Sequence, residues 1–192
     1  MPNKYSASEF IKTVYSLLIT RITYSEARLI RRPIYIRGRK SIVGGSGLTT
    51  GRFCRFDLDG AKQTLYIGKN CEMGDMTHIV ALNKVSIGDD VLIASKCFIS
   101  DTDHGCYKGI NQDSAIVPPN RRKLVSGETI IGNNVWIGEN VVILAGSSIG
   151  DGCIIGANSV VKGEIPKGTI IAGSPAKVIK KWDADSGKWI KI

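Results

Sequence analysis

The feature that most constrains the fold of this chain is a six-residue repeat over residues 131–166. Aliphatic residues recur at intervals of six, with glycine after four of them: Ile131, Ile137, Ile143, Ile149, Ile155 and Val161. A helix of about 3.6 residues per turn would scatter this spacing around its circumference, and a continuous strand does not pass through so many Gly, Asn and Asp residues. The repeat therefore predicts short strands joined by tight corners, each stacked on its equivalent in the next coil.

A second position of the repeat is also restricted in size. The fifth residue of each phrase is small or aliphatic, so we expect it to point inward: Val135, Val141, Ser147, Cys153, Ser159 and Ile165. Cys71 and Cys97 hold the same position in earlier phrases. We therefore interpret these thiols as small core residues, and the five cysteines contain no CxxC spacing that would indicate a structural zinc site.

The repeat extends upstream with a change of frame. Ile67, Met73 and Ile79 step by six, the frame shifts by two, and the same step returns at Ile87, Ile93 and Ile99. Three phrases make a triangular coil with three short faces. We count one coil from Ile67, one from Ile87, two from Ile131 and one irregular coil ahead of them.

The repeat is interrupted at residues 105–128 and then resumes in phase at Ile131. A solenoid accepts an insertion only at a corner, where it projects as a loop. Loops of this length in a compact domain are usually functional or disordered. This one follows directly after Asp101, Thr102, Asp103 and His104, which favours function.

The two ends of the chain differ from the repeat. We expect an N-terminal helical segment at 1–36, the solenoid domain at 37–175 and a basic tail at 176–192. The N-terminal segment carries apolar residues at helical spacing, with Ser6 or Ser8 able to cap its start. Its apolar stripe is expected to cover the end of the solenoid; the alternative is that it lies on an anionic membrane surface beside several arginines.

Composition limits the function classes. Hydrophobic residues make up 43% of the 192 residues, and neither a long apolar run nor a signal peptide is visible, so we expect a soluble, cytoplasmic protein. The formal net charge of +9 fits a solvated basic surface, an anionic cofactor, an acidic polymer or an anionic membrane face. Nucleic acid is disfavoured, because the basic residues are not interleaved with aromatic ones and form no recognisable binding motif.

The hexads, the interrupting loop, the DTDH sequence before it and the IAGSPAK sequence at 171–177 together resemble the hexapeptide-repeat acyltransferases. The chain looks most like the sugar O-acetyltransferases, which include the galactoside and maltose enzymes, and especially those that acetylate surface polysaccharides such as O-antigen and capsule. The resemblance implies a left-handed parallel β-helix, acetyl-CoA as co-substrate, no required metal, and a homotrimer with active sites between neighbours.

Acetyl transfer to a sugar hydroxyl needs a general base, and histidine suits that role near neutral pH. The chain has only His78 and His104. The resemblance places the catalytic base at His104, and either Asp101 or Asp103 is a candidate to orient its ring. Cys106 stands two residues away, but the family pattern uses no covalent nucleophile.

The remaining candidate site residues come partly from the resemblance and partly from residue type and position. Asp75, His78 and Trp136 are candidates for acceptor binding, although Asp75 and His78 are equally well explained as polar residues on a coil face. Trp136, Ala157, Lys162, Lys177 and Lys180 match positions that contact coenzyme A, where cations suit its phosphates. Arg121, Arg122 and Lys123 in the loop are candidates for an acidic glycan or the same phosphates.

The sequence also bears on three other functions. A carbonic anhydrase of this fold needs three zinc-binding histidines, and the chain has two histidines in total. An amino-sugar N-acetyltransferase remains open within the same class. A non-catalytic trimeric scaffold remains open from a different class, although the DTDH sequence argues against it.

Overall fold

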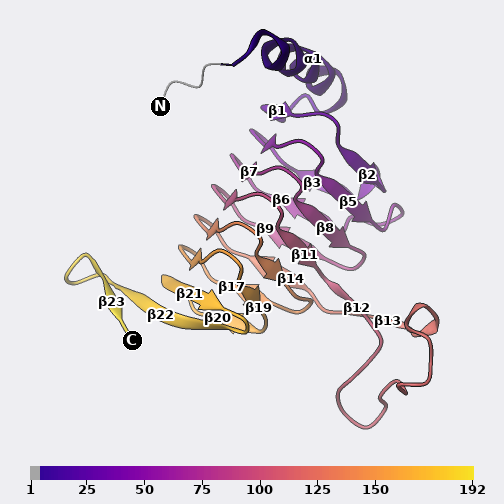
Figure 1. Ribbon diagram of the computed structural model, residues 1–192, viewed down its shortest axis with the longest axis vertical. Helices are drawn as coiled ribbons and strands as arrows, with labels where there is room; N and C mark the ends of the chain where they lie inside the picture. Colours follow the sequence, from indigo (N-terminus) through magenta and orange to yellow (C-terminus); the bar gives the residue numbers. More distant parts are fainter. Residues whose placement is uncertain (1–4) are drawn as a thin grey trace.

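The computed structural model describes residues 5–192 and shows a left-handed parallel β-helix of about seven turns, with three sheets around a narrow core (Figure 1). Sheet A contains β1 (Leu29–Ile30), β4 (Thr49–Thr50), β7 (Glu72–Met73), β10 (Leu92–Ile93), β15 (Trp136–Ile137), β18 (Ile154–Ile155) and β21 (Thr169–Gly173). Sheet B contains β2 (Tyr35–Arg37), β5 (Arg55–Leu58), β8 (His78–Ala81), β11 (Phe98–Ser100), β16 (Val142–Ile143) and β19 (Val160–Val161). Sheet C contains β3 (Ile42–Gly44), β6 (Leu65–Ile67), β9 (Val85–Ile87), β14 (Thr129–Ile131), β17 (Ser148–Ile149) and β20 (Glu164–Ile165).

The core is a set of inward columns formed by the repeat. In sheet A the strand register stacks Met73, Ile93, Ile137, Ile155 and Ile171, and all five side chains are buried. The fifth-position residues are buried as well, including the predicted cysteines, except that Ile165 in the last phrase is only half-buried. Both inward positions predicted from the sequence are therefore confirmed.

The corners explain why Asn and Asp recur between the strands. Asn70, Asp90 and Asn134 occupy equivalent corners with φ of 55°, 56° and 55°. This left-handed conformation is costly for most residues but is tolerated by Asn and Asp, whose short polar side chains bond locally. The strands can therefore stay short while the coil turns through three corners per circuit.

The sequence-based count of five coils was too low. The first turn uses β1, β2 and β3, with the 3-10 turn η1 (Arg39–Ser41) before β3, so the parallel sheets already include residues assigned to the helical segment 1–36. The first four residues of that segment lie outside the described residues. Only one irregular coil was expected ahead of Ile67, because residues 34–59 follow no six-residue spacing.

The helix α1 (Ala7–Thr23) covers the first coil, and Ser6 caps it through a reciprocal bond pair with Glu9. The expectation that its apolar stripe covers the solenoid was wrong. The buried helix residues are Ser16 and Thr20, whereas Phe10, Ile11, Leu18 and Ile22 are exposed. Among residues 5–192, no helix has the length and apolar character needed to cross a bilayer.

The expected basic tail is a β-hairpin at the opposite end of the molecule (Figure 1). Strands β22 (Ala176–Asp183) and β23 (Lys188–Lys191) continue sheet A in antiparallel fashion after β21. Trp182 and Trp189 pack edge to face with ring centroids 5.4 Å apart. The last coil is thus extended by an ordered hairpin.

Candidate active site

The interruption of the repeat leaves the solenoid at the corner between sheets B and C and projects from its side (Figure 1). Its neck is an antiparallel ribbon of β12 (Thr102–His104) and β13 (Leu124–Ser126), and its far part contains a 3-10 turn, η2 (Pro119–Arg121). We call this projecting loop, residues 105–128 with the preceding strand β12, the excursion. The ribbon orders its base and places His104 opposite Leu124.

Asp101 anchors the neck and does not orient His104. Its side chain is fully buried and accepts hydrogen bonds from the backbone N–H groups of Leu82, Asn83 and Lys84, at 3.1, 2.7 and 2.7 Å. The Thr102 hydroxyl donates a fourth, at 2.6 Å. Both carboxylate oxygens are used, so the sequence-based candidacy of Asp101 as an orienting group was wrong.

His104 is exposed at the end of β12. Asp103 precedes it on the same strand, and successive side chains on a strand point to opposite faces, so Asp103 is not placed to orient the ring. Among the described residues, no side chain bonds the imidazole of His104. The ring is therefore open to an incoming acceptor.

The backbone of His104 is held by Tyr107, which the sequence does not mark as a site residue, and by Arg122, which was expected to bind anions. The Tyr107 hydroxyl donates to the His104 carbonyl oxygen and accepts from the Arg122 guanidinium at 2.5 Å. Arg122 also donates to the Val117 carbonyl oxygen at 2.9 Å. Arg122 is thus a structural member of the excursion, whereas Arg121 and Lys123 are exposed. No periodic signal marks Tyr107, because the excursion has no repeat.

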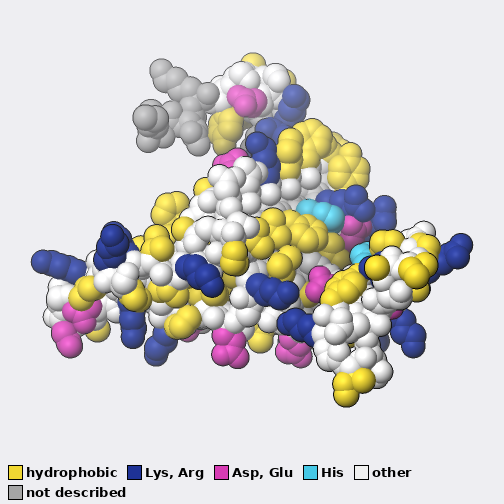
Figure 2. Space-filling view, turned by 60° about the horizontal axis from the view of Figure 1, so that its bottom comes forward, with side chains coloured by type: hydrophobic (Ala, Val, Ile, Leu, Met, Phe, Trp, Pro, Cys, Tyr) yellow, Lys and Arg dark blue, Asp and Glu magenta, His cyan; other side chains and the backbone are white. Residues whose placement is uncertain are grey.

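His78 lies on the outward face of sheet B in a charged cluster. Its Nε2 is 3.0 Å from Asp57 Oδ2, which also accepts from Arg55 Nε at 2.6 Å. Partial burial raises the pKa of Asp57, but the hydrogen bonds from Arg55 and His78 and the charges of Arg55 and Arg37 outweigh it, so this pKa is lowered overall. Figure 2 shows both histidines, in cyan, on one face of the molecule.

Asp75 has a structural contact at the corner after β7. Its Oδ1 accepts a 2.6 Å hydrogen bond from the Arg52 backbone N–H. Asp89 and Asp151 make the same kind of bond at other corners, to the backbone N–H groups of Lys69 and Asn133. Asp75 is therefore one of a series of corner caps.

Trp136 lies on sheet A with 51% of its side chain exposed. Its register neighbours are Leu92 and Ile154, which extend an outward apolar row along the sheet. The neck carrying His104 projects from the corner between sheets B and C. One copy of the chain therefore does not bring Trp136 and His104 to the same face.

The predicted coenzyme residues are all exposed but are spread over the molecule. Ala157 lies at the corner between sheets A and B, and Lys162 lies at the same B–C corner column as the excursion. Lys177 and Lys180 lie on β22. Within residues 5–192, no three His, Cys, Asp or Glu side chains form a group that could hold a metal ion.

The family model described as bacterial transferase hexapeptide (six repeats) matches residues 128–163. The chain is 43% identical, over its full length and 97% of the relative, to Escherichia coli K12 WbbJ, which is provisionally described as a lipopolysaccharide biosynthesis O-acetyltransferase. It is 38% identical to Escherichia coli K12 galactoside O-acetyltransferase over 61% of this chain and 54% of that one.

The fold matches solved structures as well. A galactoside acetyltransferase in complex with coenzyme A superposes with a TM-score of 0.61 at 27% identity, over 99% of this chain and 82% of that one. The Bacillus cereus N-acyltransferase AntD, with a dTDP-amino sugar and coenzyme A, superposes with a TM-score of 0.71 at 22% identity, over 97% and 94% of the two chains. The second likeness concerns the fold alone.

Proposed function

The chain belongs to the hexapeptide-repeat acyltransferase family, and from this we propose that it moves an acetyl group from acetyl-CoA to a sugar hydroxyl of a bacterial surface polysaccharide or its precursor. The observation that carries the proposal is the exposed imidazole of His104 at the neck of an ordered excursion. Likeness to WbbJ over the full chain supports the hydroxyl acceptor and the polysaccharide class.

The reaction we propose is direct transfer. His104 takes the proton of the sugar hydroxyl while the hydroxyl oxygen attacks the thioester carbonyl, and it returns that proton to the thiolate of coenzyme A as the carbon–sulfur bond breaks. The products are the O-acetyl sugar and free coenzyme A. The Tyr107 and Arg122 contacts hold the backbone at His104, which favours one ring position relative to the acceptor.

A complete site needs more than one copy of the chain in this proposal. Trp136 and His104 lie on different faces of a single solenoid, and the predicted coenzyme residues occupy two corners and a terminal hairpin. A homotrimer of side-by-side solenoids would bring the His104 face of one subunit towards a neighbour's sheet. The exposed apolar row at Leu92 and Trp136 supports such packing.

The donor and acceptor are bound by different groups. Lys162, Lys177 and Lys180 are exposed cations suited to the phosphates of acetyl-CoA, with Ala157 and Trp136 along its arm. The acceptor would meet His78, whose ring is held by Asp57 on sheet B. One carboxylate oxygen of Asp75 accepts the hydrogen bond at its corner, so only the other oxygen can bind the sugar, which makes Asp75 a weaker candidate. We place the reaction in the cytoplasm, where acetyl-CoA is available.

The direct test is thiol release from acetyl-CoA across a panel of sugars, nucleotide sugars, amino sugars and surface polysaccharides, with product analysis by mass spectrometry. We expect ester products on sugar hydroxyls. Amide products alone would favour the amino-sugar N-acetyltransferase. Absence of thiol release with every acceptor, in a preparation that binds coenzyme A, would favour the non-catalytic scaffold function.

A further inference from the structure

The helix α1 presents its apolar face to the outside. Its exposed side chains follow one broad stripe, with fractional exposures of 61%, 66%, 60% and 80% for Phe10, Ile11, Leu18 and Ile22. The opposite face, towards β1, carries Ser16 and Thr20. This is the reverse of the usual orientation of a helix on a globular core.

Hydrogen bonds to the first coil fix this orientation. The Thr20 hydroxyl accepts from the Ile30 backbone N–H at 2.9 Å, and the Ser16 hydroxyl accepts from the Arg32 backbone N–H at 3.2 Å. The first coil has no preceding strand to satisfy these N–H groups, so the helix hydroxyls take that role. Turning the apolar stripe inward would leave the buried Ile30 N–H without a partner.

The positive charge of the protein is concentrated at the same end. Residues 1–56 contain 11 lysines and arginines and two glutamates, whereas the other 136 residues contain 15 basic and 15 acidic residues. The whole net charge of +9 therefore belongs to the segment that forms α1 and the first two coils. Figure 2 shows hydrophobic and basic side chains side by side around the helical end, at the top.

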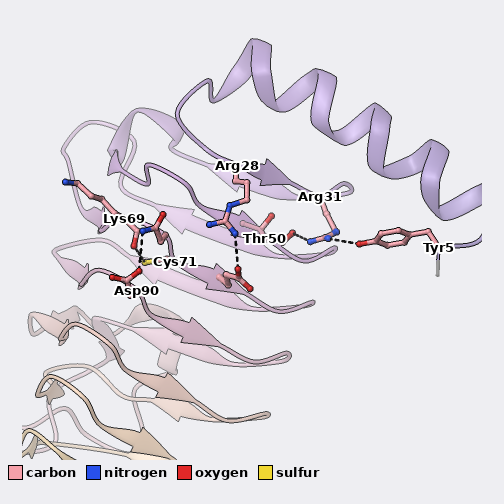
Figure 3. Close-up of polar contacts among 9 residues, drawn as sticks. Tyr5, Arg28, Arg31, Thr50, Lys69, Cys71 and Asp90 are labelled. Carbon is pink, nitrogen blue, oxygen red and sulfur yellow. Dashed lines mark hydrogen bonds and ion pairs between the residues drawn. The ribbon is translucent and has the colours of Figure 1, made fainter. Parts of the chain in front are cut away.

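Several of these arginines are engaged within the protein, including Arg37 and Arg55, which pair with Asp57. Arg28 pairs with Glu72 at 3.1 Å, and Arg31 donates to the Thr50 carbonyl oxygen and to Tyr5, each at 3.4 Å (Figure 3). Within residues 5–192, no carboxylate lies within 4.0 Å of a nitrogen of four further cations at this end: Lys12, Arg21, Arg39 and Arg52.

Three of these cations border a groove of about 850 Å³ between α1 and the first coil. These three cations, Lys12, Arg39 and Arg52, line it together with Arg32, the single carboxylate of Glu9, and aromatic and aliphatic side chains. The guanidinium of Arg39 lies over the ring of Tyr24, 4.1 Å from its centroid. The buried Tyr24 hydroxyl has no hydrogen-bond partner among the described residues. The groove thus has four cationic side chains and one carboxylate next to an apolar stripe.

We propose that α1 and the flanking cations form a docking surface for an anionic phospholipid bilayer. The stripe of Phe10, Ile11, Leu18 and Ile22 lies at the acyl boundary, with the helix parallel to the surface, and the cations of the groove bind lipid phosphates. A second copy of the chain is disfavoured as the occupant, because a two-fold contact through α1 would oppose two ends that each carry the full positive charge.

Vesicle co-sedimentation of the full chain tests the docking. We expect binding to phosphatidylcholine vesicles that contain phosphatidylglycerol, weak binding to phosphatidylcholine alone, and a fall in binding at high salt. The double variant Ile11→Glu/Leu18→Glu should lower the affinity by about tenfold or more, since it places two charges in the apolar stripe. The matched control is Ile190→Glu/Ile192→Glu at the opposite end, where both side chains are also exposed (Figure 1).

The outcomes separate this proposal from the transfer reaction, on which it does not depend. The double variant should keep the wild-type oligomeric state by sedimentation equilibrium and the wild-type rate of thiol release with a water-soluble acceptor. Equal vesicle binding by variant and wild type, or no binding of wild type to anionic vesicles, would overturn the proposal. A change of oligomeric state in the variant would overturn it too, by assigning α1 to contacts between copies.

Discussion

The Tyr107 hydroxyl donates a hydrogen bond to the backbone carbonyl oxygen of His104. Tyr107 is in turn held by the Arg122 guanidinium, so a residue late in the excursion fixes the backbone at the proposed base. The positioning of His104 can therefore be tested by a substitution at Tyr107, and its role in proton transfer by a substitution at His104 itself.

Removing the Tyr107 hydroxyl should affect turnover more than binding. We expect Tyr107→Phe to lower kcat by about tenfold, because the histidine is less well positioned, while KM for acetyl-CoA stays unchanged. Steady-state kinetics by thiol release measures both. Tyr66→Phe is the matched control, since the hydroxyl of Tyr66, on sheet C, donates a 3.3 Å bond to a backbone carbonyl, that of Gln63. A rise in KM alone would contradict a positioning role.

The hydroxyl face of α1 predicts a stability difference between two threonines. Thr20→Val should lower the free energy of unfolding by about 1–3 kcal/mol, because the buried Ile30 N–H loses its acceptor. Thr13→Val should be neutral or stabilising, since the buried Thr13 hydroxyl has no partner among the described residues. Thermal unfolding of both variants measures the difference. Equal effects would mean that the hydroxyl bonds do not hold the helix.

This helix also shows where the sequence was insufficient. Hydrophobic spacing predicted α1 itself, but the usual rule that an apolar stripe faces the core gave the wrong face. The deciding feature is the open edge of the first coil, where the N–H groups of Ile30 and Arg32 find their hydrogen-bond acceptors in the Thr20 and Ser16 hydroxyls. That requirement appears only once the chain is known to end a solenoid there.

The repeat predicted the regular coils and part of the site, but not the first irregular turns or the C-terminal hairpin. Its period predicted the buried columns. Its interruption marked His104 as a candidate, because an insertion must leave at a corner and His104 directly precedes this one. Asp101 was misassigned because a DTDH sequence does not reveal that the first carboxylate turns inward to bind the backbone of residues 82–84. Tyr107 was missed because contacts inside a non-repeating loop have no spacing to indicate them.

The ion pairs of Asp57 predict a pH dependence of stability. The pKa of Asp57 is lowered on folding, so its contribution to stability is present above the unfolded pKa of about 3.9 and is lost as the pH falls through the lower folded value. Asp57→Asn should lower Tm at pH 7, and the difference from wild type should shrink below about pH 4. Thermal unfolding from pH 7 to 3 measures it. Asp103→Asn, at an exposed carboxylate, is the control. A Tm difference between wild type and Asp57→Asn that stays constant from pH 7 to 3 would contradict the account.

The cysteines should differ in reactivity. Burial raises the pKa of Cys54 to about 11 and also raises the pKa values of Cys71 and Cys97, whereas Cys106 is only half-buried. A thiol reagent at pH 8 should therefore titrate one thiol in the native protein and five after denaturation. Cys106→Ser should remove the native signal and keep acetyl transfer near the wild-type rate. Loss of transfer in Cys106→Ser would instead indicate a covalent thiol intermediate.

The central claim is that His104 is the general base for acetyl transfer. The most direct measurement is the rate of thiol release from acetyl-CoA by His104→Ala with an accepted sugar, alongside coenzyme A binding and the oligomeric state of the same preparation. We predict a rate lowered by about 10²–10⁴-fold, with coenzyme binding and assembly unchanged. Transfer at close to the wild-type rate in His104→Ala would contradict the account.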